Sequence, residues 1–209
     1  MKKEELIILL KDTIREMPHR IDGIYVCKRL FSGLSSINQE AFGALEKLYD
    51  IALYTSILSG DFAVLFHQFL SSVLLYERKY AMAKLYPLMN ESFKQLYGFV
   101  DAKSGLVKIT KDAYWTEVQA LVTYMNREET LLYDDLEKRL QEKASFNWWR
   151  DERSAEVHLD AEGIYKHRCA QDDENKAIKD AMSFYEVLTR TSALTTKLLA
   201  RLSGTHIKQ

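Results

Sequence analysis

The side chains best suited to chemistry are gathered between Trp148 and His158. This stretch holds two tryptophans, two arginines, three acidic residues and a histidine within eleven residues. Histidine titrates near neutral pH and acts as a general base or acid. Arginine is a permanent, forked cation suited to a phosphate or to its pentavalent transition state. These residue types point to cleavage of a phosphodiester, with Arg153 and His158 as the central pair.

An α-helical reading of this stretch divides it into an apolar and a polar stripe. The apolar stripe consists of Trp148, Ala155 and Leu159, and the polar stripe of Asp151, Ser154, His158 and Glu162. Arg153 projects about 140° away from His158 around the axis, at roughly 100° per residue. One regular helix does not bring this pair together, whereas two facing copies of the helix would. The plainer interpretation is a solvated amphipathic helix anchored by its tryptophans.

The segment from Arg153 to His158 fits a motif of an arginine, four to six residues and a histidine. In this it resembles HEPN domains (higher eukaryotes and prokaryotes nucleotide-binding). The longer string from Arg150 to Arg168, which includes Tyr165, is similar to the stand-alone prokaryotic members. The resemblance implies an all-helical bundle that dimerises so that both motifs meet in one cleft. It also implies metal-independent endoribonuclease activity, which many active members have.

The resemblance gives each of these residues an expected role. His158 would handle the proton on the ribose 2′-hydroxyl or on the leaving oxygen, and Arg153 would stabilise the phosphate. Ser154 stands directly after the arginine, where the family prefers a polar residue and most typically asparagine. The substrate-binding residues implied by the resemblance are Arg150, Tyr165 and Arg168. The implied partners are a second copy of the chain, an RNA substrate, and an antitoxin or nucleotidyltransferase, as in toxin or phage-defence systems; no cofactor is expected.

Two other interpretations of the same residues stay open. In the first, the bundle binds a partner or a nucleotide without catalysis, which the formal net charge of −1 and the serine at position 154 favour. In the second, the protein is a structural dimer in which Arg153 and His158 make hydrogen bonds between helices. A second match to the motif, Arg201 to His206, is set aside because Gly204 and the chain end are expected to fray it.

Metal and nucleotide chemistry find little support in the sequence. Di-iron helical bundles need two Glu-x-x-His motifs, and the one match, Glu16 to His19, contains Pro18 at an expected helix end. His67 lies in an apolar run, where a buried, hydrogen-bonded histidine is the expected state. The sequence has no glycine-rich phosphate loop, nucleophile elbow or dinucleotide fingerprint. No metal site is therefore predicted.

Composition places the chain among ordinary globular proteins. Its 209 residues are 47% apolar and 28% charged, which is typical of one packed domain over residues 1–209. A net charge of −1 excludes a strong overall basic excess, so contact with nucleic acid would be local. Cys27 and Cys169 form no metal-binding pattern and fit a reducing compartment. The apolar run from Leu6 to Leu10 is too short for a signal peptide, so we expect a cytoplasmic protein without a membrane segment.

The scarcity of helix-breaking residues predicts long helices. The chain has two prolines and eight glycines. Apolar periodicity and capping signals place the expected helices at roughly 3–17 (ended by Pro18), 24–34, 36–59 (with a Ser36–Gln39 capping box), 62–86 after a stop at Gly60–Asp61, 88–99, 112–143 and beyond Asp172–Asp173. The clearest loop is Asp101 to Thr110. The predicted fold is an all-α, antiparallel bundle of five to seven helices.

Overall fold

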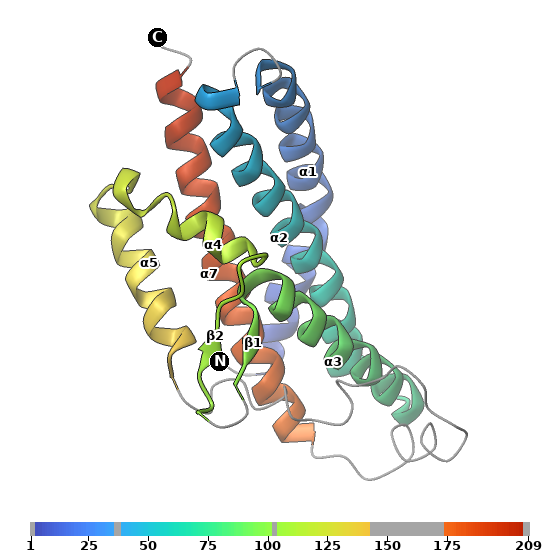
Figure 1. Cartoon of the computed structure of the whole chain (residues 1–209). Helices are drawn as coiled ribbons and strands as arrows, with labels where there is room; N and C mark the ends of the chain where they lie inside the picture. Colours follow the sequence, from blue (N-terminus) through green and yellow to red (C-terminus); the bar gives the residue numbers. More distant parts are fainter. Residues whose placement is uncertain (1–2, 36–38, 102–103, 143–173, 207–209) are drawn as a thin grey trace.

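The computed structural model describes residues 3–35, 39–101, 104–142 and 174–206. Of these residues, 86% are helical, and they form an antiparallel helical bundle with six α-helices (Figure 1). The helices are α1 (Lys3–Ser35), α2 (Gln39–Ser71), α3 (Leu75–Tyr97), α4 (Tyr114–Gln119), α5 (Arg127–Leu140) and α7 (Glu174–His206). The predicted all-α bundle is thereby confirmed.

The first helix continues where the sequence predicted its end. α1 passes through Pro18 and Gly23, so the expected separate helices at 3–17 and 24–34 are wrong. An internal proline costs a helix about 3 kcal/mol, but the side chain of Pro18 lies exposed on the outer side of α1. The same helix buries four large apolar residues, Leu6, Leu10, Met17 and Phe31. At roughly 1.5–3 kcal/mol each, this burial outweighs the cost of the proline.

The central helix also runs through its predicted break. α2 continues across Gly60 and Asp61, where a stop was expected, and ends at Ser71. Glycine weakens a helix by about 1 kcal/mol, whereas the neighbouring Phe62 and Phe66 are fully buried. A Cβ atom at Gly60 would lie 3.5 Å from Cβ of Met17, which shows how closely α1 and α2 approach here. The expected helix 62–86 is therefore divided between α2 and α3, and α3 continues through Pro87.

α2 lies at the centre of the bundle, between α1, α3 and α7 (Figure 1). By length and composition its Gly43–Ser71 part could cross a membrane, because it contains an apolar stretch of 18 residues with a mean hydropathy of 1.2. Within the bundle, 56% of this apolar stretch is buried. Burial of this kind is typical of the core helix of a helical bundle.

The expected helix 112–143 is broken into α4, a short 3-10 turn at Val122–Tyr124, and α5. The restart has a clear local cause. The side chain of Asn126 accepts a hydrogen bond from the Glu129 backbone at 3.0 Å, and the Glu129 carboxylate accepts one from the Asn126 backbone at 2.8 Å. This reciprocal capping box satisfies N–H groups that the first turn of α5 would otherwise leave unpaired.

The expected loop from Asp101 to Thr110 contains one strand of a small β-hairpin. Strand β1 (Phe99–Val100) pairs with β2 (Val107–Lys108) in antiparallel register, Phe99 opposite Lys108. Gly98 joins α3 to β1 with φ of 107°, a conformation that favours glycine. A Cβ atom at Gly98 would lie 2.3 Å from the carbonyl oxygen of Lys108, so the tight turn also requires glycine for space.

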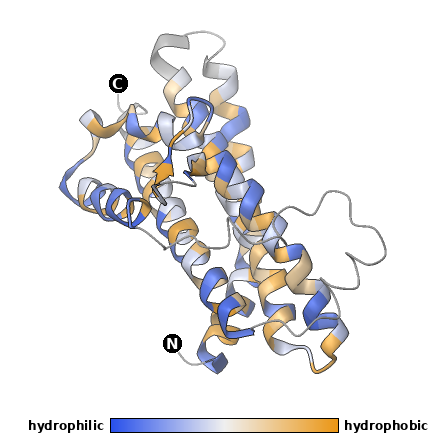
Figure 2. Ribbon diagram, turned by 60° about the horizontal axis from the view of Figure 1, so that its bottom comes forward, coloured by the Kyte–Doolittle hydropathy of each residue, from blue (hydrophilic) through white to orange (hydrophobic). Residues whose placement is uncertain are grey.

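The long final helix, α7, completes the core. Its apolar face includes Ala177, Leu188, Leu194 and Leu198, all buried. Figure 2 shows that the α5 ribbon is mostly hydrophilic in contrast, and the buried apolar residues of α5 are Leu136 and Leu140.

Two buried tyrosines of α3 fix polar groups of α7. The hydroxyl of Tyr86 donates to Oδ2 of Asp180 at 2.8 Å, and the hydroxyl of Tyr97 is hydrogen-bonded to Thr191. Both tyrosines are 1% exposed, so neither hydroxyl reaches the surface. Buried hydroxyls need partners, and the polar groups of α7 provide them.

Candidate functional site

The predicted site residues lie outside the part of the chain that the structure describes. They are Arg150, Arg153, Ser154, His158, Tyr165 and Arg168, all within 143–173. The structure does describe the two helices that this segment joins, α5 and α7. The end of α5 and the start of α7 are therefore the described parts of the chain that are nearest to the motif in the sequence.

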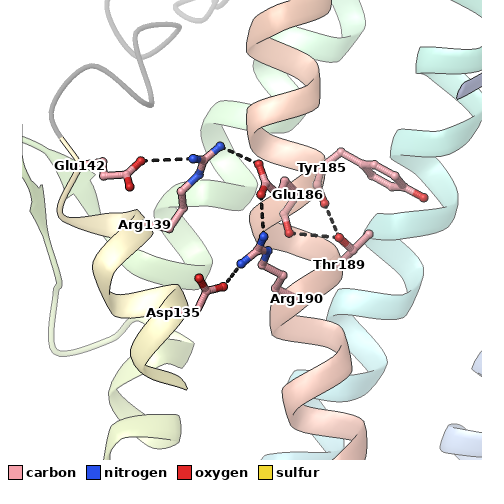
Figure 3. Close-up of polar contacts among 7 residues, drawn as sticks. All are labelled: Asp135, Arg139, Glu142, Tyr185, Glu186, Thr189 and Arg190. Carbon is pink, nitrogen blue, oxygen red and sulfur yellow. Dashed lines mark hydrogen bonds and ion pairs between the residues drawn. The ribbon is translucent and has the colours of Figure 1, made fainter. Parts of the chain in front are cut away.

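A cluster of alternating charges joins α5 to α7 (Figure 3). Arg139 of α5 donates to Glu186 of α7 at 2.6 Å and to Glu142 at 3.2 Å. Arg190 of α7 donates to the other oxygen of Glu186 at 2.8 Å and pairs with Asp135 of α5. Each arginine thus lies between two carboxylates, and the five side chains carry a net charge of −1.

This α5–α7 charge cluster orients the helices more than it stabilises them. The side chains of Arg139, Glu186 and Arg190 are 30–38% exposed. At such exposure one ion pair contributes about 0.2–1 kcal/mol. The fixed fork of a guanidinium nevertheless sets direction as well as distance. The cluster therefore holds α5 in one orientation along α7.

This cluster was not predicted from the sequence, although the spacing of its acidic residues and arginines is visible there. Asp135 and Arg139 are spaced i, i+4 on α5, and Glu186 and Arg190 are spaced i, i+4 on α7. Such acid–arginine pairs are expected to bond along their own helix. Of these two pairs, Glu186 and Arg190 bond along their own helix, at 2.8 Å, and both arginines bond across to the other helix.

A cavity of about 500 Å³ lies beside the charge cluster. Leu6 of α1 and Ile178 and Met182 of α7 contribute apolar walls. Arg139 and Lys179 bring positive charge to its lining, and Glu186 brings negative charge. This volume falls within the range of small-molecule sites, about 300–1,000 Å³.

The other end of α5 is held by Arg201 of α7. Its Nε donates to Glu129 at 2.9 Å, and its terminal nitrogen donates to Glu129 at 2.7 Å and to the carbonyl oxygen of Tyr124 at 2.6 Å. The Glu129 side chain is only 2% exposed. Burial alone raises the pKa of this carboxyl, but the hydrogen bonds from Arg201 and from the Asn126 backbone outweigh it, so the pKa is lowered overall.

These contacts give a structural role to the arginine of the second motif match, Arg201 to His206. Arg201 has a structural partner in Glu129, so it is occupied in holding two helices together. The match was set aside on the expectation that Gly204 would fray the helix. That reason is wrong, because α7 continues through Gly204 to His206.

His67 does not have the setting of a metal ligand or a catalytic base. Its Nδ1 lies 3.4 Å from Oγ of Ser71, while Nε2 is buried with no hydrogen-bond partner among the described residues. Burial, and secondarily the charge of Lys11, lowers the pKa of the imidazole, so the neutral form dominates at neutral pH. Within the described ranges, no group of three His, Cys, Asp or Glu residues is placed to hold a metal ion. Glu16 and His19 lie exposed on α1, inside a helix and not at its end as expected.

Comparison of the chain with protein-family models, with curated proteins and with solved structures finds no match. The features that bear on function are therefore the Arg153–His158 motif and the geometry of the described helices.

Proposed function

We propose that this protein is a metal-independent endoribonuclease of the HEPN type that acts as a homodimer. The observation that carries the proposal is the Arg153–His158 motif in the segment that joins two helices of an all-α bundle. Arg153 and His158 point about 140° apart around one helix, so they do not meet within one copy of the chain. A second copy would supply a second motif, so that an arginine and a histidine from different copies can face each other. A toxin or phage-defence role, with an antitoxin or nucleotidyltransferase as partner, belongs to the same proposal.

The proposed reaction is an internal transfer within RNA. His158 takes the proton from a ribose 2′-hydroxyl as that oxygen forms a bond to the adjacent phosphorus. The bond from phosphorus to the 5′-oxygen breaks, and this oxygen leaves with a proton, so the products are a 2′,3′-cyclic phosphate and a 5′-hydroxyl. Arg153 stabilises the additional charge on the phosphate in the transition state. Arg150, Tyr165 and Arg168 bind the flanking RNA.

The test is cleavage of a mixed RNA pool in EDTA. The wild type should cleave the pool, and His158→Ala should cut it about 10²–10⁴-fold more slowly, as expected for the loss of a general acid–base group. The matched control is His19→Ala, since His19 is an exposed histidine of α1, and this variant should retain full activity. Circular dichroism should show equal helicity in all three proteins. Equal cleavage by wild type and a folded His158→Ala variant would refute the assignment of the site.

A second candidate function is a non-catalytic binding or scaffold protein that uses the same bundle. Its support is the charge distribution of the described helices. Arg78, Arg139, Arg190 and Arg201 are each paired with a carboxylate, and the chain as a whole carries a charge of −1. A folded, dimeric wild type that leaves the RNA pool intact would favour this function over the ribonuclease.

A further inference from the structure

The cavity between α1, α5 and α7 has the features of a ligand site. Its apolar walls come from different parts of the chain, Leu6 near the start of α1 and Ile178 and Met182 on α7. Leu6 is 3% exposed, so this wall is part of the packed core. Ile178 and Met182 are only partly buried, so the apolar surface that a ligand's hydrocarbon part can cover in this cavity of about 500 Å³ is mainly theirs.

The polar side of the cavity offers donors that the described residues leave unused. Lys179 is exposed at the opening, and no ion pair to it is found among the described acidic residues. The Nε of Arg139 is buried and has no hydrogen-bond partner within the described chain, although both terminal nitrogens of Arg139 are bound to glutamates. An unpaired buried donor is rare in proteins and costs about 1–3 kcal/mol.

The charged residues that line the cavity favour an anion. Arg139, Lys179 and Glu186 line it, which gives the lining a net charge of +1. Glu186 already accepts from Arg139 and Arg190, so its negative charge is compensated. The positive charge without a partner in the described chain is that of Lys179, at the opening, while the apolar wall lies at Leu6, Ile178 and Met182.

We propose that this cavity binds a small amphipathic anion, namely an aliphatic carboxylate of medium chain length. The hydrocarbon chain lies against Leu6, Ile178 and Met182, and the carboxylate pairs with Lys179 at the opening. A neutral molecule of the same length would cover the apolar wall but would not pair with Lys179, which has no ion pair among the described residues. The binding does not depend on the proposed ribonuclease function.

The test is equilibrium dialysis of radiolabelled decanoate, octanoate and decanol against the full-length chain. We expect one decanoate per chain. Octanoate should bind about fifteenfold more weakly, because each CH₂ withdrawn from water contributes about fourfold in affinity. The ratio of the dissociation constants of decanol and decanoate should fall about fivefold in Lys179→Gln, as expected for one partly exposed ion pair. Met182→Trp, which places a larger side chain in the cavity, should weaken binding of all three.

Lys111→Gln is the matched control, since Lys111 is an exposed lysine before α4 and does not line the cavity. It should bind like the wild type. Absence of saturable decanoate binding would overturn the proposal, and so would an unchanged decanol-to-decanoate ratio in Lys179→Gln. Lys179→Gln changes an exposed side chain, so it keeps the proposal testable even if circular dichroism shows that Met182→Trp does not fold.

Discussion

Replacement of Arg201 by methionine should destabilise the protein strongly at neutral pH and much less in acid. At pH 7 the change leaves the carboxylate of Glu129, 2% exposed, without its cation. Removal of one partner from a buried ion pair typically costs 3–5 kcal/mol. We expect a loss of about 3 kcal/mol for Arg201→Met, because the Asn126 backbone still donates to Glu129 at 2.8 Å.

The pH dependence follows from the direction of the pKa shift. In the wild type the folded pKa of Glu129 lies below its ordinary value of 4.5. The ionised carboxylate therefore contributes stability above about pH 4.5, and this contribution is lost as the pH falls through the folded pKa. In Arg201→Met the largest lowering contribution is gone and burial raises the pKa instead. Protonation then favours the folded variant, so the difference from wild type narrows between pH 7 and pH 4.5.

The assay is urea unfolding of both proteins at pH 7, 5.5 and 4.5, followed by far-ultraviolet circular dichroism. Glu129→Gln is the informative companion, since its amide can still accept from the Asn126 backbone and Arg201 can turn to water. We expect it to lose about 1–2 kcal/mol at pH 7, and to show little of the narrowing in acid. A loss below about 1 kcal/mol for Arg201→Met, or an equal loss at all three pH values, would refute the reasoning.

Two further substitutions, each compared with a control substitution, test the fold by the same urea unfolding. Gly98→Ala should lower the free energy of unfolding by at least about 2 kcal/mol, because its φ is 107° and the new Cβ would lie 2.3 Å from a backbone oxygen of β2. Gly105→Ala, with φ of 71° and no neighbour within 4 Å, should cost about 1 kcal/mol, and equal losses would contradict the steric argument. Tyr86→Phe removes a hydroxyl that donates to buried Asp180 at 2.8 Å, so a loss of about 1–3 kcal/mol is expected. The same change at half-exposed Tyr25 should have little effect, and a Tyr86 loss no larger than this would show that Asp180 does not need the hydroxyl.

The helical class was predictable because it depends on composition and periodicity. In α7, for example, apolar residues at helical spacing, including Leu188 and Leu194, form the buried face. Helix ends were less predictable. Pro18 and Gly60 were read as breaks because their local cost, about 1–3 kcal/mol, is visible in the sequence. The burial that outweighs this cost depends on the neighbouring helix, which the sequence does not show.

The opposite error occurred at Asn126. Its capping box with Glu129 is a local pattern that can be recognised in the sequence. Apolar periodicity from Trp115 to Leu136 nevertheless suggested one continuous helix. Here the local signal was correct, since α5 begins directly after Asn126.

One of the two candidate sites can be recognised in the sequence, and the other cannot. The pair Arg153 and His158 is recognisable as a motif, and its catalytic role stays a prediction. The cavity was not predictable, because Leu6 and Lys179 are separated by most of the chain and meet only after folding. A lysine beside an apolar wall has no sequence signature of its own.

The attachment of α5 gives the bundle a part that responds to ionic strength. α5 buries only Leu136 and Leu140 as apolar residues, and charged pairs to α7 hold it near both ends, through Arg139 and Arg201. Added salt screens the more exposed pairs, such as those of Arg139, but leaves hydrophobic packing largely intact. Opening of α5 thus needs much less free energy than global unfolding, and it becomes easier as salt rises while α2 stays closed. In hydrogen exchange, α5 would behave as a separate, salt-sensitive cooperative unit on a stable four-helix core of α1, α2, α3 and α7.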